Sequence, residues 1–135
     1  MNKILYGEDE YTNRKLVEYG FLRKGVQCDL ASDGYTAYEL FCCKSYSAVI
    51  LDQFMPGISG SEVARKIRAI DREIPLIAIT SDECQIPELK KAGFTRIFLK
   101  PLSILECVDE ILELLNRRQS RLKRTAVKYH PRISD

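Results

Sequence analysis

The sequence contains no tryptophan, only one histidine (His130), and no apolar run long enough to cross a bilayer. A single histidine is too few for a Cys/His metal site, and none of the five cysteines forms a Cys-x-x-Cys pair. An odd cysteine count without a secretory segment argues against a disulfide framework. We therefore expect a cytoplasmic protein with free thiols and no membrane association.

The charged residues are unevenly distributed along the chain. The 135 residues are 45% hydrophobic and 30% charged, which is typical of one soluble globular domain. Residues 1–116 hold 14 basic and 18 acidic side chains, whereas residues 117–135 hold 7 basic side chains and one acid. This contrast predicts a domain over residues 1–117, followed at 118–135 by a basic extension that continues a helix or forms a linker.

Short apolar runs alternate with amphipathic segments five times. The runs predict strands at 4–7, 26–30, 48–51, 76–79 and 97–99, and helices at about 12–24, from 33–34, at 62–70, at 87–92 and from 103. This order predicts an α/β fold with a five-stranded parallel sheet, doubly wound by helices on both faces. The core positions expected from helical spacing include Leu16, Val17, Tyr19 and Phe21 in the first helix and Val63, Ile67 and Ile70 in the third.

Polar side chains end or directly follow four of the five predicted strands, and they are Glu8, Asp9, Asp52, Thr80 and Lys100. The carboxyl ends of parallel strands meet at one edge of a sheet, so these residues should share one crevice. Three carboxylates repel one another unless a cation lies among them, and oxygen ligands suit Mg²⁺. A carboxylate can also attack phosphorus, while a lysine and a hydroxyl stabilise the transferred group. Taken singly, each residue is more often a solvated or helix-capping side chain.

The sequence resembles the receiver domains of two-component response regulators over residues 2–117. The matching features, in the family's order, are Ile4-Leu5-x-x-Glu8-Asp9-Glu10, Ile50-Leu51-Asp52-x-x-Met55-Pro56-x-x-x-Gly60, Ile77-Ala78-Ile79-Thr80, Ala92-Gly93 and Lys100-Pro101. The resemblance implies a flavodoxin-like (βα)5 receiver fold with an extended C-terminal helix. It also implies that Asp52 accepts the phosphoryl group.

The resemblance assigns further roles to the crevice residues. Asp9, Asp52 and the backbone carbonyl of Phe54 would bind Mg²⁺, and Glu8 would hold a metal-bound water. Thr80 would contact the phosphoryl group and Lys100 would pair with it, next to a cis Lys100–Pro101 bond. The phosphoryl donor would be a histidine kinase or a phosphotransfer protein, and the output would be a downstream effector protein.

Three positions depart from the family pattern. Ile97 stands where the family has a tyrosine or phenylalanine that moves inward on activation, and strand alternation places Phe98 on the opposite face. Phe54, two residues after Asp52, should hinder the attacking water and slow hydrolysis of the phosphoryl group. Ser81 replaces a smaller residue and would crowd the phosphate.

The basic tail is open to three interpretations. It could be a solvated, frayed extension, a helical dimerisation arm or linker, or a basic patch for nucleic acid or acidic surfaces. The last is least favoured because no DNA-binding fold is recognisable. A seven-residue repeat supports the second interpretation, with positions Leu105, Leu112, Gln119 and Ala126, and Val108, Leu115, Leu122 and Tyr129.

The leading hypothesis for function is a phosphorylation-dependent signalling switch. It would have no enzymatic activity beyond Mg²⁺-dependent self-phosphorylation and self-dephosphorylation. A phosphate-independent interaction module that dimerises through its C-terminal helix is the alternative. A hydrolytic phosphatase would need an acid two residues after its nucleophile, and Phe54 occupies that place.

Overall fold

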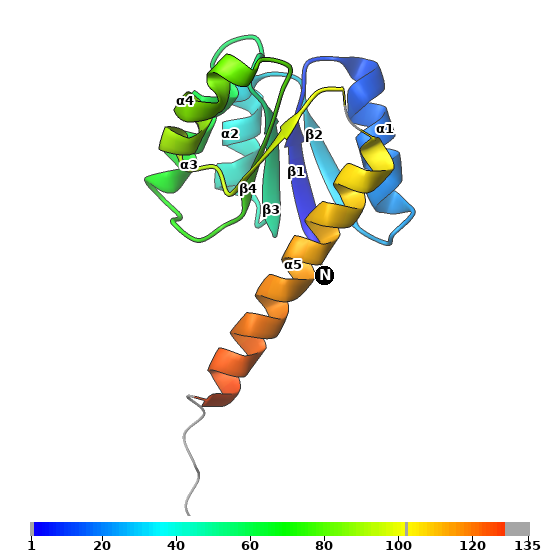
Figure 1. The fold of residues 1–135 in the computed structure, drawn as a ribbon, viewed down its shortest axis with the longest axis vertical. Coiled ribbons are helices and arrows are strands. Elements are labelled where there is room, and N and C mark those ends of the chain that lie inside the picture. The colour runs from blue at the N-terminus through cyan, green and yellow to red at the C-terminus, as the bar shows by residue number, and fades with distance from the viewer. Residues whose placement is uncertain (1, 102, 129–135) are drawn as a thin grey trace, which may run out of the picture.

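The described part of the chain forms one parallel sheet with helices on both faces. The computed structural model describes residues 2–101 and 103–128 (Figure 1). Within them the strands are β1 (Lys3–Gly7), β2 (Gln27–Ala31), β3 (Ala48–Asp52), β4 (Leu76–Thr80) and β5 (Arg96–Leu99). All pair in parallel, in the order β2-β1-β3-β4-β5. This confirms the predicted doubly wound α/β fold.

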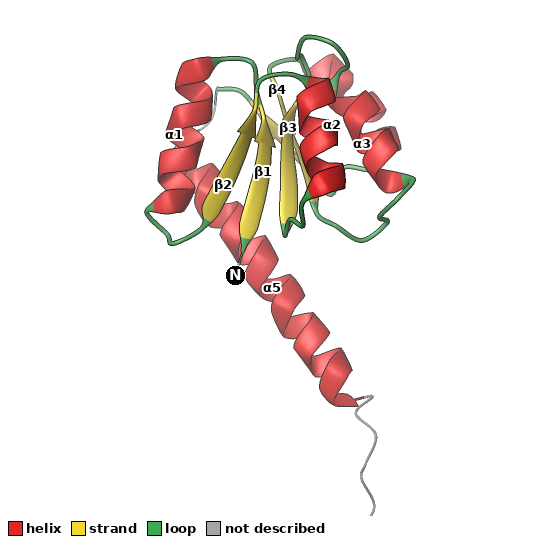
Figure 2. Cartoon of the chain, turned by 180° about the vertical axis from the view of Figure 1, so that it is seen from behind, coloured by secondary structure: helices red, strands yellow, loops and turns green. Residues whose placement is uncertain are grey.

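The helices cover the two faces of the sheet separately (Figures 1 and 2). On one face lie α1 (Tyr11–Leu22) and α5 (Ile104–Lys128); on the other lie α2 (Gly34–Cys43), α3 (Gly60–Arg68) and α4 (Ile86–Ala92), which follows a 3-10 turn, η1 (Glu83–Gln85). Each face has its own apolar core, one against α1 and α5 and one against α2, α3 and α4. Strands β3 and β4 are buried along their whole length, as expected of central strands covered on both sides.

The local sequence sets where these helices begin and end. The Asp33 carboxylate accepts a hydrogen bond from the Thr36 amide at 2.8 Å at the start of α2. Ser59 caps α3 in the same way. Gly93, with a φ of 99°, ends α4 in the left-handed conformation that glycine adopts without steric cost. Ser103, where the last helix was predicted to begin, caps α5, since the Glu106 amide donates to Ser103 Oγ at 3.4 Å.

Three core positions predicted from helical spacing were wrong. Leu16 and Tyr19 are 48% and 59% exposed, whereas Val17 and Phe21 are buried. Each residue turns a helix by about 100°, so Tyr19, two positions from both buried residues, lies on the opposite side of α1. Ile70 is 61% exposed because α3 ends at Arg68 and the chain has already left the sheet.

Helix α5 runs without a break past the predicted boundary at residue 117 as far as Lys128 (Figure 1). Val108 and Leu115 are buried against the sheet, but Leu122 is 55% exposed. Gln119 Nε2 still reaches the body, donating to Asn2 Oδ1 at 2.8 Å. The repeat position Tyr129 lies outside the described residues, so the proposed seam remains a prediction. No described helix is both long and apolar enough to span a membrane.

Candidate functional site

The carboxyl ends of β1, β3 and β5 bring three charged side chains into contact. Glu8 follows β1, Asp52 ends β3 and Lys100 follows β5. The Lys100 ammonium lies 2.5 Å from Asp52 Oδ2 and 3.3 Å from Glu8 Oε1. Both carboxylates are almost fully buried, with 4% of Asp52 and 1% of Glu8 exposed. The predicted convergence of distant residues at this edge is therefore present for these three.

The two carboxylates of this crevice stabilise the charged form of Lys100. Burial alone would lower the pKa of Lys100, but its hydrogen bond to Asp52 and the negative charges of Asp52 and Glu8 outweigh that effect and raise the pKa. Burial also raises the pKa of the neighbouring Tyr6 hydroxyl, and the charges of Glu8 and Asp52 add to the rise. Lys100 is thus held as a cation, and Tyr6 as a neutral hydrogen-bond donor.

The backbone around Asp52 is tightly fixed. The Phe54 amide donates to Asp52 Oδ1 at 3.0 Å, so each carboxylate oxygen of Asp52 has a hydrogen-bond partner. The Gly60 amide, at the start of α3, donates to the Gln53 carbonyl at 3.0 Å. A Cβ at Gly60 would lie 2.5 Å from the Asp52 carbonyl oxygen. Only glycine allows α3 to approach the end of β3 this closely.

The remaining predicted residues lie around this cluster. Thr80, the last residue of β4, is fully buried, and its hydroxyl accepts a hydrogen bond from the Asp82 amide at 3.2 Å. The Thr80 carbonyl accepts from the Lys100 amide at 2.8 Å, which joins the ends of β4 and β5. Asp9 is exposed. The Lys100–Pro101 bond is cis, as predicted.

The charge balance of the crevice fits an added divalent cation. Glu8 and Asp52 place two buried carboxylates against the single ammonium of Lys100, and Asp9, the residue after Glu8, is an exposed third carboxylate. Carboxylate and carbonyl oxygens are the ligands that Mg²⁺ prefers. Among the described residues no three acidic, histidine or cysteine side chains form a ready-made metal cluster. The residues that could hold the ion are the predicted ligands Asp9, Asp52 and the Phe54 carbonyl, and the predicted role of Glu8 is to hold a metal-bound water.

Three residues that support Glu8 were missed by the sequence analysis. The Tyr6 hydroxyl and Asn13 Nδ2 donate to Glu8 Oε1 at 3.4 and 3.1 Å, and Arg14 donates to the Glu8 carbonyl at 2.8 Å. Strand alternation could have indicated Tyr6, because residues two apart on a strand share a face. The contacts from α1 depend on the angle at which that helix crosses the sheet.

Residues 97 and 98 face opposite sides of the sheet, as predicted. Ile97 packs against the core beneath α2, α3 and α4, whereas Phe98 packs against the core beneath α1 and α5. Phe98 therefore does not replace the missing aromatic side chain at position 97.

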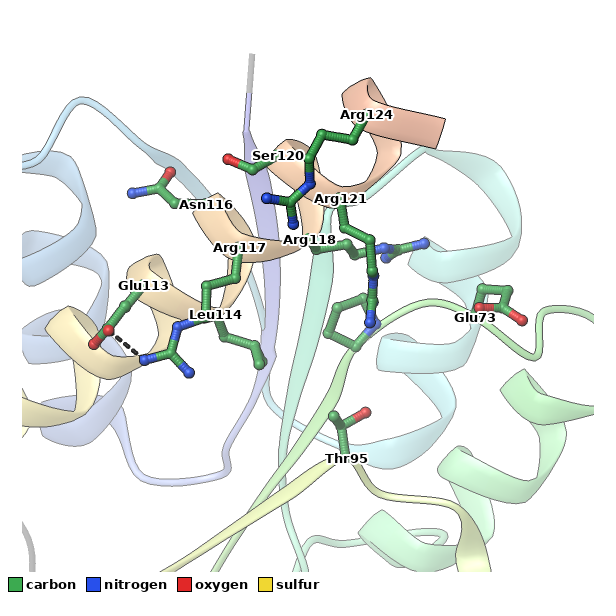
Figure 3. Close-up of a pocket in the computed structure, with 11 residues that line it drawn as sticks. Glu73, Thr95, Glu113, Leu114, Asn116, Arg117, Arg118, Ser120, Arg121 and Arg124 are labelled. Atoms are coloured by element: carbon green, nitrogen blue, oxygen red, sulfur yellow. Dashed lines mark hydrogen bonds and ion pairs between the residues drawn. The ribbon is translucent and has the colours of Figure 1, made fainter. Parts of the chain in front are cut away.

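A basic hollow lies at the amino ends of β4 and β5, where Pro75 and Thr95 line it (Figure 3). It has a volume of 630 Å³ and lies between α5 and the segment around Glu73. Arg118, Arg121 and Arg124 line it, and Arg117 pairs with Glu113 one helical turn earlier. The basic tail predicted from sequence thus begins as one side of this hollow.

Comparison with known proteins places these features in a family. The model of the response regulator receiver domain matches residues 4–112. The transcriptional regulatory protein SrrA of Staphylococcus aureus is 33% identical over 121 residues, which are 88% of this chain and 50% of that protein. The chain therefore spans about half the length of this curated relative.

Solved structures with the same fold include the following two, each more than 25% identical to this chain. Response regulator protein TrrA of Thermotoga maritima, in complex with Mg²⁺ and BeF, is 31% identical, with a TM-score of 0.77 over 84% of this chain and 99% of that one. The receiver domain of a sensor histidine kinase from Pseudomonas aeruginosa, with a magnesium ion in its active site cleft, is 27% identical, with a TM-score of 0.75 over 86% and 95% of the two chains. The sequence match, the fold and the strand-end crevice agree, and the chain belongs to the family of response regulator receiver domains.

Proposed function

We propose that this receiver domain takes a phosphoryl group onto Asp52 and thereby controls a protein partner or a downstream output. The observation that carries the proposal is the buried Asp52 carboxylate held between the Lys100 ammonium and the Phe54 amide. An aspartate needs no such fixed cation if it only caps a turn. The donor would be a phosphohistidine on a sensor histidine kinase or a phosphotransfer protein.

The chain's own residues account for the transfer step. An Asp52 oxygen attacks the phosphorus, the new P–O bond forms, and the P–N bond to the donor histidine breaks with its electron pair leaving on nitrogen. Lys100 would stay beside the transferred group and balance its charge. Thr80 would turn its hydroxyl toward a phosphoryl oxygen. The Lys100 amide donates to the Thr80 carbonyl, so the backbones that carry both side chains are held together at the ends of β4 and β5.

Mg²⁺ would be bound by Asp9, Asp52 and the carbonyl of Phe54, with Glu8 holding a bound water. When bound, the ion would neutralise charge on the transferring phosphoryl oxygens. Glu8 is kept in position for this role by its contacts with Tyr6 and Asn13. The Pseudomonas aeruginosa receiver domain holds magnesium in its active site cleft and TrrA is in complex with Mg²⁺ and BeF, which supports the same use of magnesium here.

The test is the intact mass of the protein after incubation with Mg²⁺ and a small-molecule phosphodonor. We expect one alkali-labile phosphate on the wild type, and none on Asp52→Ala or after magnesium is chelated. Labelling that persists in Asp52→Ala would place the acceptor elsewhere. No labelling of the wild type, under conditions that label another receiver domain, would favour a phosphate-independent interaction module.

A further inference from the structure

The residue that follows Asp52 makes a polar connection to the segment before α4. Gln53 is 4% exposed, and both the oxygen and the nitrogen of its side-chain amide are hydrogen-bonded. Its Oε1 accepts from the Ser61 amide at 2.8 Å, and its Nε2 donates to Ser61 Oγ at 3.1 Å. The same Nε2 donates to Gln85 Oε1 at 3.0 Å, across 32 residues of sequence.

The orientation of both amides follows from one backbone group. The Ser61 N–H can only donate, so Gln53 must present its oxygen to it and its Nε2 to Gln85. Gln85 must then present its side-chain oxygen to Gln53 Nε2. Gln53 is also anchored through its main chain, since its amide donates to the Ile79 carbonyl at 3.0 Å. The Gln53 side chain is therefore rigidly joined to the peptide that carries Asp52.

Gln85 lies at the start of α4. It is the last residue of η1 and the first residue before α4, yet its side chain makes no capping hydrogen bond. Instead the side chain reaches back to Gln53. The Gln85 side chain thus joins the start of α4 to Gln53, the residue that follows Asp52.

A second polar link connects the same segment to the crevice. The Asp82 amide donates to the Thr80 hydroxyl at 3.2 Å, and the Asp82 side chain caps η1 by accepting from the Cys84 amide at 2.9 Å. If Thr80 turns its hydroxyl toward a phosphoryl group on Asp52, the Asp82 amide loses this acceptor. Of these two links, the Gln53–Gln85 hydrogen bond would then be the one that still opposes movement of η1 and α4.

We propose that the Gln53–Gln85 hydrogen bond holds η1 and α4 in the unphosphorylated arrangement, and that its release transmits the state of Asp52 to α4. This inference rests on the proposed function. It supplies a route that does not use position 97, where the partly buried Ile97 packs against the core beneath α2, α3 and α4. In this proposal the two arrangements differ in the hydrogen bond between Thr80 and Asp82 and in the one between Gln53 and Gln85, so the state of Asp52 and the position of α4 are coupled.

The test removes the link at its outer end with Gln85→Ala, which leaves the Gln53–Ser61 bonds intact. A net hydrogen bond of ordinary strength corresponds to roughly a two- to tenfold change in an equilibrium. We expect the amides of residues 89–93 in the unphosphorylated variant to exchange with solvent faster by about that factor. Because coupling is reciprocal, Mg²⁺ with beryllofluoride, a phosphoryl mimic, should bind the variant tighter by the same roughly two- to tenfold factor.

The matched control is Cys84→Ala, which alters the exposed neighbouring side chain and leaves both polar links in place. Exchange can be followed residue by residue by NMR, and mimic affinity by titration of the amide signals of residues 52–54. If Gln85→Ala matches the control in α4 exchange and in mimic affinity, the inference is overturned while the proposed function stands. If the wild type binds no mimic and accepts no phosphate, both fail.

Discussion

Replacement of Lys100 by methionine isolates the electrostatic core of the crevice. The ammonium lies within 3.3 Å of Glu8 and 2.5 Å of Asp52, and its removal leaves two buried carboxylates facing each other. Removing one partner of a buried ion pair typically costs about 3–5 kcal/mol. The Lys100 side chain is 31% exposed, so solvent screening reduces this cost, and we expect roughly 1–3 kcal/mol of lost unfolding free energy.

Magnesium should restore most of that loss. In Lys100→Met the two carboxylates no longer have an ammonium between them, so a divalent ion gains more by binding the folded variant than by binding the wild type. Urea unfolding of both proteins, in chelator and in millimolar Mg²⁺, measures the difference directly. Lys123→Met, which removes an exposed lysine of α5, should change stability by no more than about 0.5 kcal/mol. The reasoning is refuted if Lys100→Met is as stable as this control in chelator, or if Mg²⁺ stabilises the wild type and the variant equally.

Three further predictions concern other parts of the domain. Burial opposes ionisation of Asp29, but the Tyr46 hydroxyl and two lysines outweigh it and lower the pKa of Asp29 below 3.8. The stabilisation of the folded state by ionised Asp29 is complete above pH 3.8 and is lost as the pH falls through the lowered pKa of the folded state. Asp29→Asn should therefore be less stable than the wild type by roughly 1–2 kcal/mol at pH 7, and this difference should disappear in acid. Urea unfolding at several pH values measures the difference, and a difference independent of pH would contradict the prediction. Phe54 is 52% exposed, and its amide contacts the Asp52 carboxylate. We expect its ring to slow water attack, so Phe54→Asn should shorten the lifetime of the phosphoryl group in a phosphate-release assay, and an unchanged lifetime would refute the shielding role. Gly60→Ala should cost about 1–3 kcal/mol because its Cβ would meet the Asp52 carbonyl at 2.5 Å, and a thermal midpoint like that of the wild type would show that α3 can move away freely.

Much of the fold could be predicted because its signals are local or follow a strict period. The continuous apolar runs of β3 and β4 identified buried central strands, and Asp33 and Gly93 marked helix ends through capping rules. The first helix was harder, because α1 carries apolar side chains on more than one side. Exposed Leu16 and Tyr19 could not be separated from buried Val17 and Phe21 without knowing which face meets the sheet.

The candidate site shows the same division. The positions of Glu8, Asp52 and Lys100 followed from the rule that parallel strands end at one edge. The contact of Gln53 with Gln85 could not be predicted from that rule, because it depends on the path of η1 and α4 after the end of β4. Nothing in the spacing of these two glutamines indicates that their amides meet.

The central claim is that Asp52 is the acceptor, and chemical mapping of the phosphorylated protein tests it most directly. Borohydride reduces an aspartyl phosphate to homoserine and releases phosphate, which leaves a stable mark for peptide mass spectrometry. After phosphorylation in Mg²⁺ we predict that this mark appears at residue 52 and at no other acidic residue. A mark at Asp9 or at any other residue, or no mark on protein that carries phosphate, would contradict the account.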